Sequence, residues 1–272
     1  RPLIRVREIV FFKEAHTFHA TLEEAAKQVD EGVEIYKKFY DELLVPYLVV
    51  KTLPWDTFPG AKYNMDLITV MPDGKALELG SVINFGDLFA KTYDLTYMDE
   101  DGQKKYVNTC SYGISERSLA AIIAIHGDNR GPKLPPKIAP VQVVVIPIPK
   151  AGEKEPIMRK AREVYERLKS AGIRVELDDT EERPGYKYYK WDMKGVPLKV
   201  DVGSQEVRGG YVSVARRDRV ERAKIPDDHL IEGIREELLR YEEALLQQAQ
   251  EYFASRVARA KSFEEIRAAI RE

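Results

Sequence analysis

The stretch from Asn108 to Pro149 constrains the fold most, because two kinds of structure meet in it. A strand-like approach ends at Gly113, and a helix is predicted to open at Ser115. The body of that helix, residues 119–125, is apolar on every face, which is typical of a buried helix. A Pro- and Gly-rich segment, HGDNRGPKLPP, then leads to the β-branched run of residues 141–146. We therefore expect two domains that join in the Pro-rich segment.

The first turn of that predicted helix carries Arg117. Free backbone N–H groups and the helix dipole favour an anion at such a position, so the corner at residues 113–117 predicts phosphate binding. The chain has no Gly-x-x-x-x-Gly-Lys loop and no strand-linked Gly-x-Gly-x-x-Gly. A P-loop or a dinucleotide fold is therefore not supported. A nucleotide would have to be held by arginines on an antiparallel sheet.

Composition narrows the class of protein. The chain has 272 residues, 44% of them hydrophobic, which is enough to bury the cores of two domains. Its 43 basic and 45 acidic residues give a formal charge of −2, so contact with a polyanion must be local. The single cysteine, Cys110, excludes an intrachain disulfide and fits a reducing compartment. No membrane span or signal peptide is visible, and we expect a soluble, cytoplasmic protein. Because the chain starts at Arg1 rather than Met, we also expect a fragment or a processed chain.

The first strand, RPLIRVREIVFFKEAHTFHA, allows two interpretations. Its charges are typical of a solvated edge strand that resists pairing, and the pattern alone favours this interpretation. However, Phe12, Glu14 and His16 fall at alternate positions on one face. An aromatic wall, a carboxylate and an imidazole would form a pocket for a small cationic ligand.

Local signals predict the remaining elements. Thr21 and Glu24 form a capping box before a packing helix. Turns at residues 72–74 and 99–102 each join two strand-like runs, which implies antiparallel sheet. The second half alternates strands and helices, as in an α/β domain with a mixed sheet, and residues 227–260 read as a long charged helix. Ser262 and Glu265 cap a last short helix.

Two longer motifs resemble a known family. RPLIRVREIVFFKEAH resembles the second half of motif two of class II aminoacyl-tRNA synthetases, and SYGISERSLAAIIAIHGDNRG resembles their motif three. The resemblance continues through LPPKIAPVQVVVIPI, RPGYKYYKWDMKGVPLKV and ARRD. It is greatest for prolyl-tRNA synthetases of the archaeal and eukaryotic type. It implies an α/β (α+β) chain with a partial antiparallel-sheet catalytic domain (1–138), a mixed-sheet anticodon-binding domain (139–245) and the helical start of a C-terminal region (246–272).

The resemblance implies ATP-dependent activation of proline to prolyl-adenylate and transfer of proline to tRNA(Pro), by a homodimer that uses ATP and Mg²⁺. It implies no metal-ligating residue. The implied catalytic residues are Arg5 and Arg117. The implied ATP-binding residues are Arg5, Glu78, Ser81, Ser115 and Arg117. The implied amino-acid-binding residues are Phe12, Glu14, His16, Phe58, Ser81, Ser111 and Gly113. The implied anticodon-binding residues are Asp179, Glu181, Glu182, Arg183, Lys187 and Lys190.

Carboxylates could recognise the anticodon by accepting hydrogen bonds, because prolyl anticodons carry two adjacent guanines whose Watson–Crick edges present N–H donors. Without the resemblance, the segment DDTEERPGYKYYKW would be read as an ordinary solvated loop.

The chain also departs from the family pattern. Ile83 stands where a histidine usually faces proline, Glu78 where a glutamine helps to hold ATP, and Asp87 where another glutamine is common. These departures leave two alternatives open, a synthetase-like paralogue that binds tRNA without aminoacylation and a sibling class II synthetase with altered amino-acid specificity. A purely structural oligomerisation protein is a third alternative, which does not depend on these departures.

Overall fold

The computed structural model describes residues 11–271 of the chain, and side chains as far as residue 270. The chain divides into two compact units. The first unit takes the chain up to Ala121 together with the segment from Gln250, and the second is Ile122–Ala249. The expected domain limits at residues 138 and 245 stay predictions. Within the described part, no helix has the length and apolar character needed to cross a membrane.

An antiparallel sheet of five strands forms the centre of the first unit. Its order is β1-β7-β4-β3-β2, and every neighbouring pair is antiparallel. The strands are β1 (Phe12–His19), β2 (Leu48–Lys51), β3 (Tyr63–Val70), β4 (Ala76–Gly86) and β7 (Asn108–Ser115). The turn between β3 and β4 confirms the predicted hairpin at residues 72–74.

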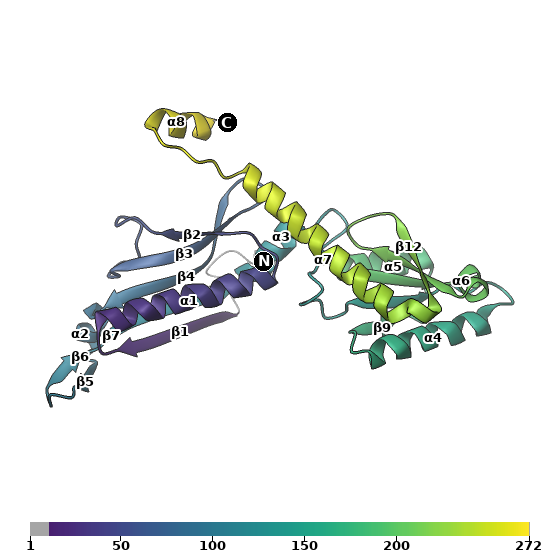
Figure 1. Ribbon diagram of the computed structural model, residues 1–272, viewed down its shortest axis with the longest axis horizontal. Helices are drawn as coiled ribbons and strands as arrows, with labels where there is room; N and C mark the ends of the chain where they lie inside the picture. Colours follow the sequence, from purple (N-terminus) through teal and green to yellow (C-terminus); the bar gives the residue numbers. More distant parts are fainter. Residues whose placement is uncertain (1–10, 272) are drawn as a thin grey trace. The chain divides into compact units, whose positions relative to one another are not determined.

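Helix α1 (Leu22–Glu42) covers one face of this sheet (Figure 1). The predicted capping box is present, because Glu24 N donates to Thr21 Oγ1 and the Glu24 carboxylate accepts from Thr21 N. The buried stripe of the helix packs on the sheet, and a Cβ added at Gly32 would lie 3.0 Å from Val82. Since alternate residues of a strand point to opposite faces, Ser81 and Ile83 face away from α1.

Shorter elements complete the first unit. They are α2 (Leu88–Tyr93), β5 (Thr96–Met98), β6 (Lys104–Tyr106) and α8 (Phe263–Arg271). Strands β5 and β6 confirm the second predicted hairpin. Ser262 Oγ accepts from Glu265 N and caps α8 as predicted.

Helix α3 (Arg117–His126) begins two residues after β7 ends, so the turn from strand to helix lies slightly later than the sequence indicates. The prediction of a fully buried α3 is wrong. Leu119 and Ile123, one helical turn apart, are 44% and 39% exposed. An apolar residue on a helix shows that burial is possible there without requiring it.

The second unit is a mixed sheet with helices, in the order β12-β11-β10-β8-β9. Strand β8 pairs in parallel with β9 and β10, whereas β10–β11 and β11–β12 are antiparallel. The strands are β8 (Val143–Pro147), β9 (Val175–Leu177), β10 (Leu198–Val202), β11 (Tyr211–Arg216) and β12 (Arg222–Pro226). Together with the antiparallel sheet of the first unit, this confirms the predicted fold class.

Helices α4 (Lys154–Ser170) and α7 (Leu230–Ser255), the latter up to Ala249, bury apolar stripes against that sheet. Helix α5 (Pro184–Met193) packs Trp191 in a second cluster, with Val144 and Ile146 of β8. The remaining elements are α6 (Ser204–Gly209) and the short 3-10 turn η2 (Asp227–His229). The segment DDTEERPGYKYYKW, which its pattern alone predicts to be a loop, is irregular only before Pro184. Helix α5 begins at Pro184, because proline is well suited to the first turn of a helix.

Candidate functional site

The strand register places the predicted substrate residues in rows across the sheet face opposite α1. Glu14 lies opposite Gly113, Gly113 opposite Ser81, and Ser81 opposite Asp66. One step further along the strands, a second row contains His16, Ser111, Ile83 and Asn64. Directly opposed residues of a sheet are close enough for their side chains to interact. Residues far apart in the sequence therefore share one surface.

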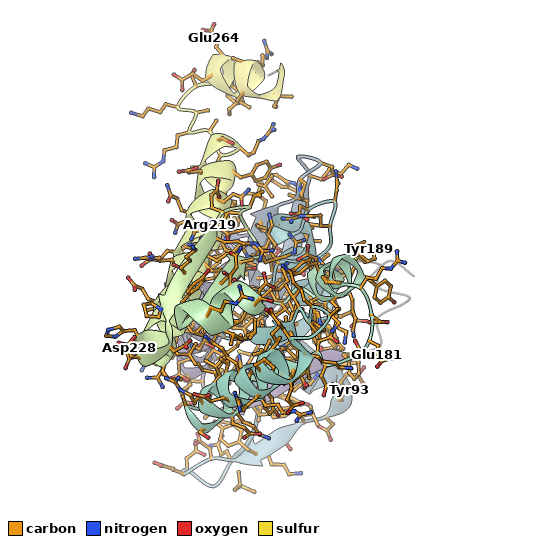
Figure 2. The ribbon with its side chains drawn as sticks, turned by 90° about the vertical axis from the view of Figure 1, so that its right-hand side faces the viewer. Tyr93, Glu181, Tyr189, Arg219, Asp228 and Glu264 are labelled. Carbon is orange, nitrogen blue, oxygen red and sulfur yellow. The ribbon has the colours of Figure 1, made fainter. Side chains whose placement is uncertain are left out.

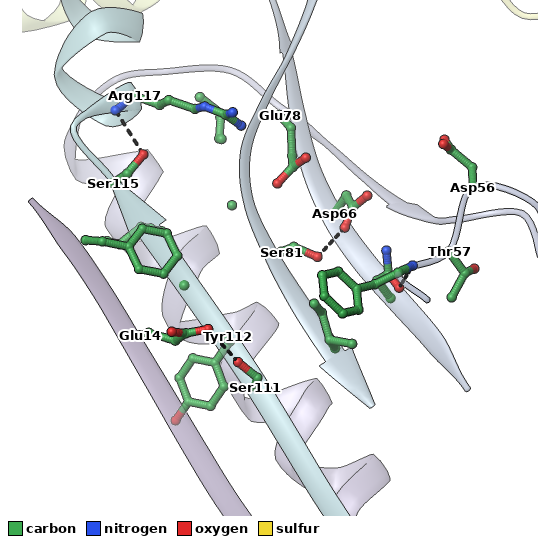
Figure 3. Close-up of a pocket in the computed structure, with 18 of the residues that line it drawn as sticks. Glu14, Asp56, Thr57, Asp66, Glu78, Ser81, Ser111, Tyr112, Ser115 and Arg117 are labelled. Carbon is green, nitrogen blue, oxygen red and sulfur yellow. Dashed lines mark hydrogen bonds between the residues drawn. The ribbon is translucent and has the colours of Figure 1, made fainter. Parts of the chain in front are cut away.

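A pocket of about 570 Å³ lies on this surface. Figure 3 shows Glu14 and Ser111 toward one end of it, and Arg117 with Glu78 toward the other. Nine of the predicted residues line the pocket: Phe12, Glu14, Phe58, Glu78, Ser81, Ser111, Gly113, Ser115 and Arg117. Two predicted substrate-binding residues are not among the residues that line this pocket. His16 lies in the adjoining row, and Arg5 lies outside the described residues.

Glu14 is a solvent-accessible carboxylate between two polar neighbours. Its Oε1 accepts from Ser111 Oγ at 3.2 Å, and its Oε2 lies 3.4 Å from His16 Nε2. Gly113 leaves room beside it, because a Cβ at this position would lie 2.7 Å from the Phe12 ring. The pocket therefore presents a carboxylate next to an aromatic wall, which suits a small ligand carrying a cationic amine.

Arg117 is fixed at the opposite end by the start of α3. Its backbone N donates to Ser115 Oγ at 3.3 Å. Oγ of the next residue, Ser118, lies 3.0 Å from Tyr40 Oη, and Tyr40 Oη donates to Leu79 O at 2.7 Å. Arg117 Nε is buried and has no hydrogen-bond partner within residues 11–271. A buried donor without a partner is unfavourable, so this guanidinium is suited to an anionic ligand.

Two carboxylates crowd the same pocket. Ser81 Oγ donates to Asp66 Oδ1 at 2.5 Å. Glu78 keeps contact with solvent, but its position in the pocket removes part of its hydration. This desolvation and the charge of Asp66 raise the pKa of Glu78, and the charge of Arg117 opposes the rise. Burial likewise raises the pKa of Asp66, against the hydrogen bond from Ser81.

The sequence analysis missed Asp66. The sequence signal that could have indicated Asp66 is a single carboxylate in the otherwise uncharged strand of residues 63–70. Asp87, in contrast, does not line the pocket. Its carboxylate pairs with Lys91 Nζ at 2.8 Å, and this hydrogen bond lowers the pKa of Asp87.

The predicted anticodon-binding residues fall into two groups. Asp179, Glu181, Glu182 and Arg183 are exposed, and Figure 2 shows Glu181 projecting from the surface of the second unit. Lys187 is buried instead, and its Nζ donates to Asp178 O at 2.7 Å. Lys190 is half-buried, with its Nζ 3.1 Å from Asp178 Oδ2 and 3.6 Å from Glu182 Oε2.

Asp178 is the centre of that buried cluster. Its carboxylate accepts from Thr180 Oγ1 at 2.5 Å and from Trp191 Nε1 at 2.6 Å. Burial alone would raise the pKa of Asp178, but these hydrogen bonds, that from Lys190 and the charge of Lys187 lower it to about 2. The cluster fixes the start of the exposed acidic loop to helix α5.

Comparison with known proteins adds a family to this geometry. Residues 1–126 match the tRNA synthetase class II core domain (G, H, P, S and T), and residues 142–237 match the anticodon binding domain. The proline--tRNA ligase of Methanothrix thermoacetophila is 47% identical over 99% of this chain, and that of Pyrococcus abyssi is 45% identical over all of it. The chain belongs to the prolyl-tRNA synthetase family.

Solved structures of this family agree. The prolyl-tRNA synthetase of Cryptosporidium parvum, complexed with L-proline and AMP, superposes on all of this chain with a TM-score of 0.93 and 33% identity. The same enzyme complexed with halofuginone and AMPPNP gives the same score. The chain spans only part of these proteins, 56% and 57% of the two ligases and 59% of the first Cryptosporidium chain.

Proposed function

We propose that the protein is a prolyl-tRNA synthetase, which activates proline with ATP and transfers it to tRNA(Pro). One observation carries the proposal. A single pocket holds an accessible carboxylate, Glu14, toward one end and the half-buried Arg117, whose buried Nε has no hydrogen-bond partner among the described residues, toward the other. Proline carries a cationic imino group, and ATP carries phosphates, so the two charges suit the two substrates.

The amino-acid end of the pocket suits a small ring. Glu14 would pair with the imino group of proline, while Phe12 and Phe58 would wall the pyrrolidine ring. Gly113 supports this arrangement, since any side chain at that position would collide with the Phe12 ring. Ser111 holds the Glu14 carboxylate by its hydrogen bond, which fixes the direction of the negative charge.

The nucleotide end would bring ATP against Arg117, with Arg5 as a second proposed phosphate ligand. In the proposed reaction, the proline carboxylate attacks the α-phosphorus and pyrophosphate leaves. Such a reaction needs reactants held in line and developing charge stabilised, and a planar guanidinium does both. The hydrogen bonds that fix Ser115 and Ser118 hold the start of α3, so Arg117 is already placed before substrates bind.

Mg²⁺ is part of the proposal as the partner of ATP. No cluster of three or more potential metal ligands occurs in the part of the chain that the structure describes, so the phosphates would be its main ligands. The fit of the site to Mg²⁺ rests on the carboxylates of Glu78 and Asp66, which both line the pocket. Desolvation in the pocket and then the charge of Asp66 raise the pKa of Glu78, so a cation beside the two carboxylates would be stabilised. Oxygen ligands of this kind suit a hard cation, which would neutralise phosphate charge when bound.

The second unit would read the anticodon of tRNA(Pro). The exposed carboxylates of Glu181 and Glu182 suit the N–H donors of guanine, and Arg183 suits O6 or phosphate. Lys187 would act indirectly, because its amino group is committed to Asp178. The proposal includes a homodimer that acts in the cytoplasm.

Proline-dependent exchange between ATP and pyrophosphate tests the function, measured with the complete gene product that contains this sequence. We expect exchange with proline and not with the other amino acids. Exchange with a different amino acid only would move the assignment to a sibling synthetase.

The second candidate is a paralogue that binds tRNA without aminoacylation, and Glu78 favours it. A carboxylate in the nucleotide end of the pocket opposes the binding of phosphate. Filter binding of tRNA(Pro), compared with an anticodon-substituted tRNA(Pro), separates the two candidates. Tight, anticodon-dependent binding without exchange would support the paralogue.

A further inference from the structure

We propose that the amino-acid pocket continues into a second, apolar cavity, and that the site takes proline-like amino acids with an apolar ring substituent. The proposal rests on the proposed function, because it assumes that the imino group lies at Glu14. It concerns the space beyond the ring of proline itself. A secondary amine with a phenyl or similar group on its ring is the class of ligand that this space would accept.

The second cavity has a volume of about 340 Å³ and adjoins the first pocket. Four residues line both cavities: Glu14, Phe58, Ile83 and Ser111. The shared wall therefore contains the carboxylate that would hold the amine. Ligand sites commonly begin at about this volume, so the second cavity has room for a substituent of several carbon atoms.

Most of the residues that line only the second cavity are apolar. They are Phe18, Phe85, Phe89, Tyr93 and Leu95. The ring centroids of Phe58 and Phe85 are 5.6 Å apart, and those of Phe85 and Phe89 are 4.7 Å apart, both edge-to-face. Such packing holds the rings in place and prepares the cavity for an aromatic group.

The carboxylate and the imidazole that line the second cavity belong to Glu14 and His16, on neighbouring rows of the sheet. Two other polar groups are engaged within the protein, because Thr109 Oγ1 donates to Gly86 O and the Cys110 thiol donates to Ala25 O of α1. The cavity thus combines a carboxylate with apolar walls, which matches a cationic amine carrying an apolar body.

The exposed rings give a driving force for such a ligand. Tyr93 is 68% exposed and Phe18 is 57% exposed. A phenyl group placed in the second cavity would remove apolar surface of these rings and of the ligand from water. Burying one such group commonly strengthens binding about tenfold or more.

Competition by trans-4-phenyl-L-proline tests the proposal in the proline-dependent exchange of the complete gene product. We expect its inhibition constant to lie at least about tenfold below the KM for proline. Leu95→Trp should fill the cavity and reduce this preference for phenylproline over proline by about tenfold. Leu22→Trp is the matched control, because Leu22 is 44% exposed at the start of α1, outside both cavities. It should leave the preference as it is in the wild type.

A second variant covers the case in which Leu95→Trp fails to fold. Tyr93→Ala removes an exposed wall and should weaken phenylproline severalfold relative to proline. If exchange depends on proline but phenylproline binds no more tightly than proline, the proposal of a second cavity is overturned and the proposed function stands. Absence of exchange with proline would overturn the proposed function. The cavity is then judged from the unfolding temperature, which phenylproline should raise in the wild type and not in Leu95→Trp. An equal rise in both proteins would overturn it.

Discussion

The two units use their charged side chains in opposite ways. In the second unit, Arg217 is fully buried, and its two terminal nitrogens donate to Asp128 at 2.9 and 2.6 Å. In the first unit, Arg117 is half-buried, and no ion pair of its guanidinium occurs among the described residues. The Nε atoms of both arginines are buried without a hydrogen-bond partner among residues 11–271, so the difference lies in the carboxylates that surround Arg217. An arginine paired with carboxylates of the protein is a structural charge, whereas an arginine without such a pair is available to a ligand.

The carboxylates repeat this contrast. Asp178 in the second unit receives hydrogen bonds from three side chains, and its pKa is lowered to about 2. Glu78 in the first unit loses hydration in the pocket and lies near the carboxylate of Asp66, and both raise its pKa. A lowered pKa shows that the protein already stabilises the charge. A raised pKa shows that the charge is still unfavourable, so an incoming cation or a proton would stabilise the site.

Replacing Arg217 by methionine should have the largest effect on the second unit. The change leaves Asp128 and the buried Asp192 with less positive charge around them, and removing one partner of a buried pair commonly costs about 3–5 kcal/mol. Urea unfolding followed by Trp191 fluorescence measures the loss, in a Trp55→Phe background so that one tryptophan remains. Arg208→Met is the control, since Arg208 is exposed and pairs with Glu153 at the surface, and it should cost less than about 1 kcal/mol. Equal losses would break the comparison.

Arg117→Ala should affect activity and leave stability unchanged. Loss of a preorganised charge-stabilising group commonly lowers the rate by about 10²–10³-fold, and we expect proline-dependent exchange to fall by that factor. The unfolding temperature should match that of the wild type, because the Arg117 side chain forms no hydrogen bond or ion pair with another described residue. Arg162→Ala, an exposed position on α4, is the matched control. A large drop in unfolding temperature for Arg117→Ala would mean that this arginine is structural as well.

Asp178→Asn should remove a pH-dependent part of stability. The pKa of Asp178 is lowered from 3.8 to about 2 in the folded chain, so its charge stabilises the fold above pH 4. That contribution, on the order of 2 kcal/mol, is lost as the pH falls from about 4 to 2. The variant should be less stable by about this amount at pH 7, and the two stability curves should converge in the acid range. Curves that stay parallel would show that Asp178 is not the group responsible.

Local signals in the sequence predicted the elements that depend on neighbouring residues. The capping box of Thr21 and Glu24 and the turn at residues 72–74 were both confirmed, because each involves contacts within a few positions. Helix α5 was missed, since its aromatic residues are weak helix formers and its burial depends on partners elsewhere. Lys187 shows this most clearly, because its partner Asp178 lies nine positions away in the sequence.

Only part of the candidate site was predicted, because some of its residues are brought together by contacts between segments distant in the sequence. Alternation along β1 brought Glu14 and His16 to one face, and the family motif added Arg117. Asp66 entered only through strand pairing, because its position opposite Ser81 depends on the register of β3 and β4. The register also contains an irregularity between Leu67 and Ile68, which no local pattern in the sequence indicates.

The smallest predicted effect concerns Glu78, whose raised pKa gives the sign of a pH dependence. As the pH rises through that pKa, Glu78 becomes charged and repels phosphate, so the affinity for ATP should fall. Glu78→Gln should remove this dependence and tighten binding about threefold at pH 8, measured by the concentration of ATP at half-maximal exchange. Glu23→Gln, an exposed change on α1, is the control. If Glu78→Gln binds ATP no more tightly than the wild type, a cation that accompanies ATP must already compensate Glu78. In that case ATP and its cation would pair the charges of the first unit, whereas the second unit pairs its charges with its own side chains.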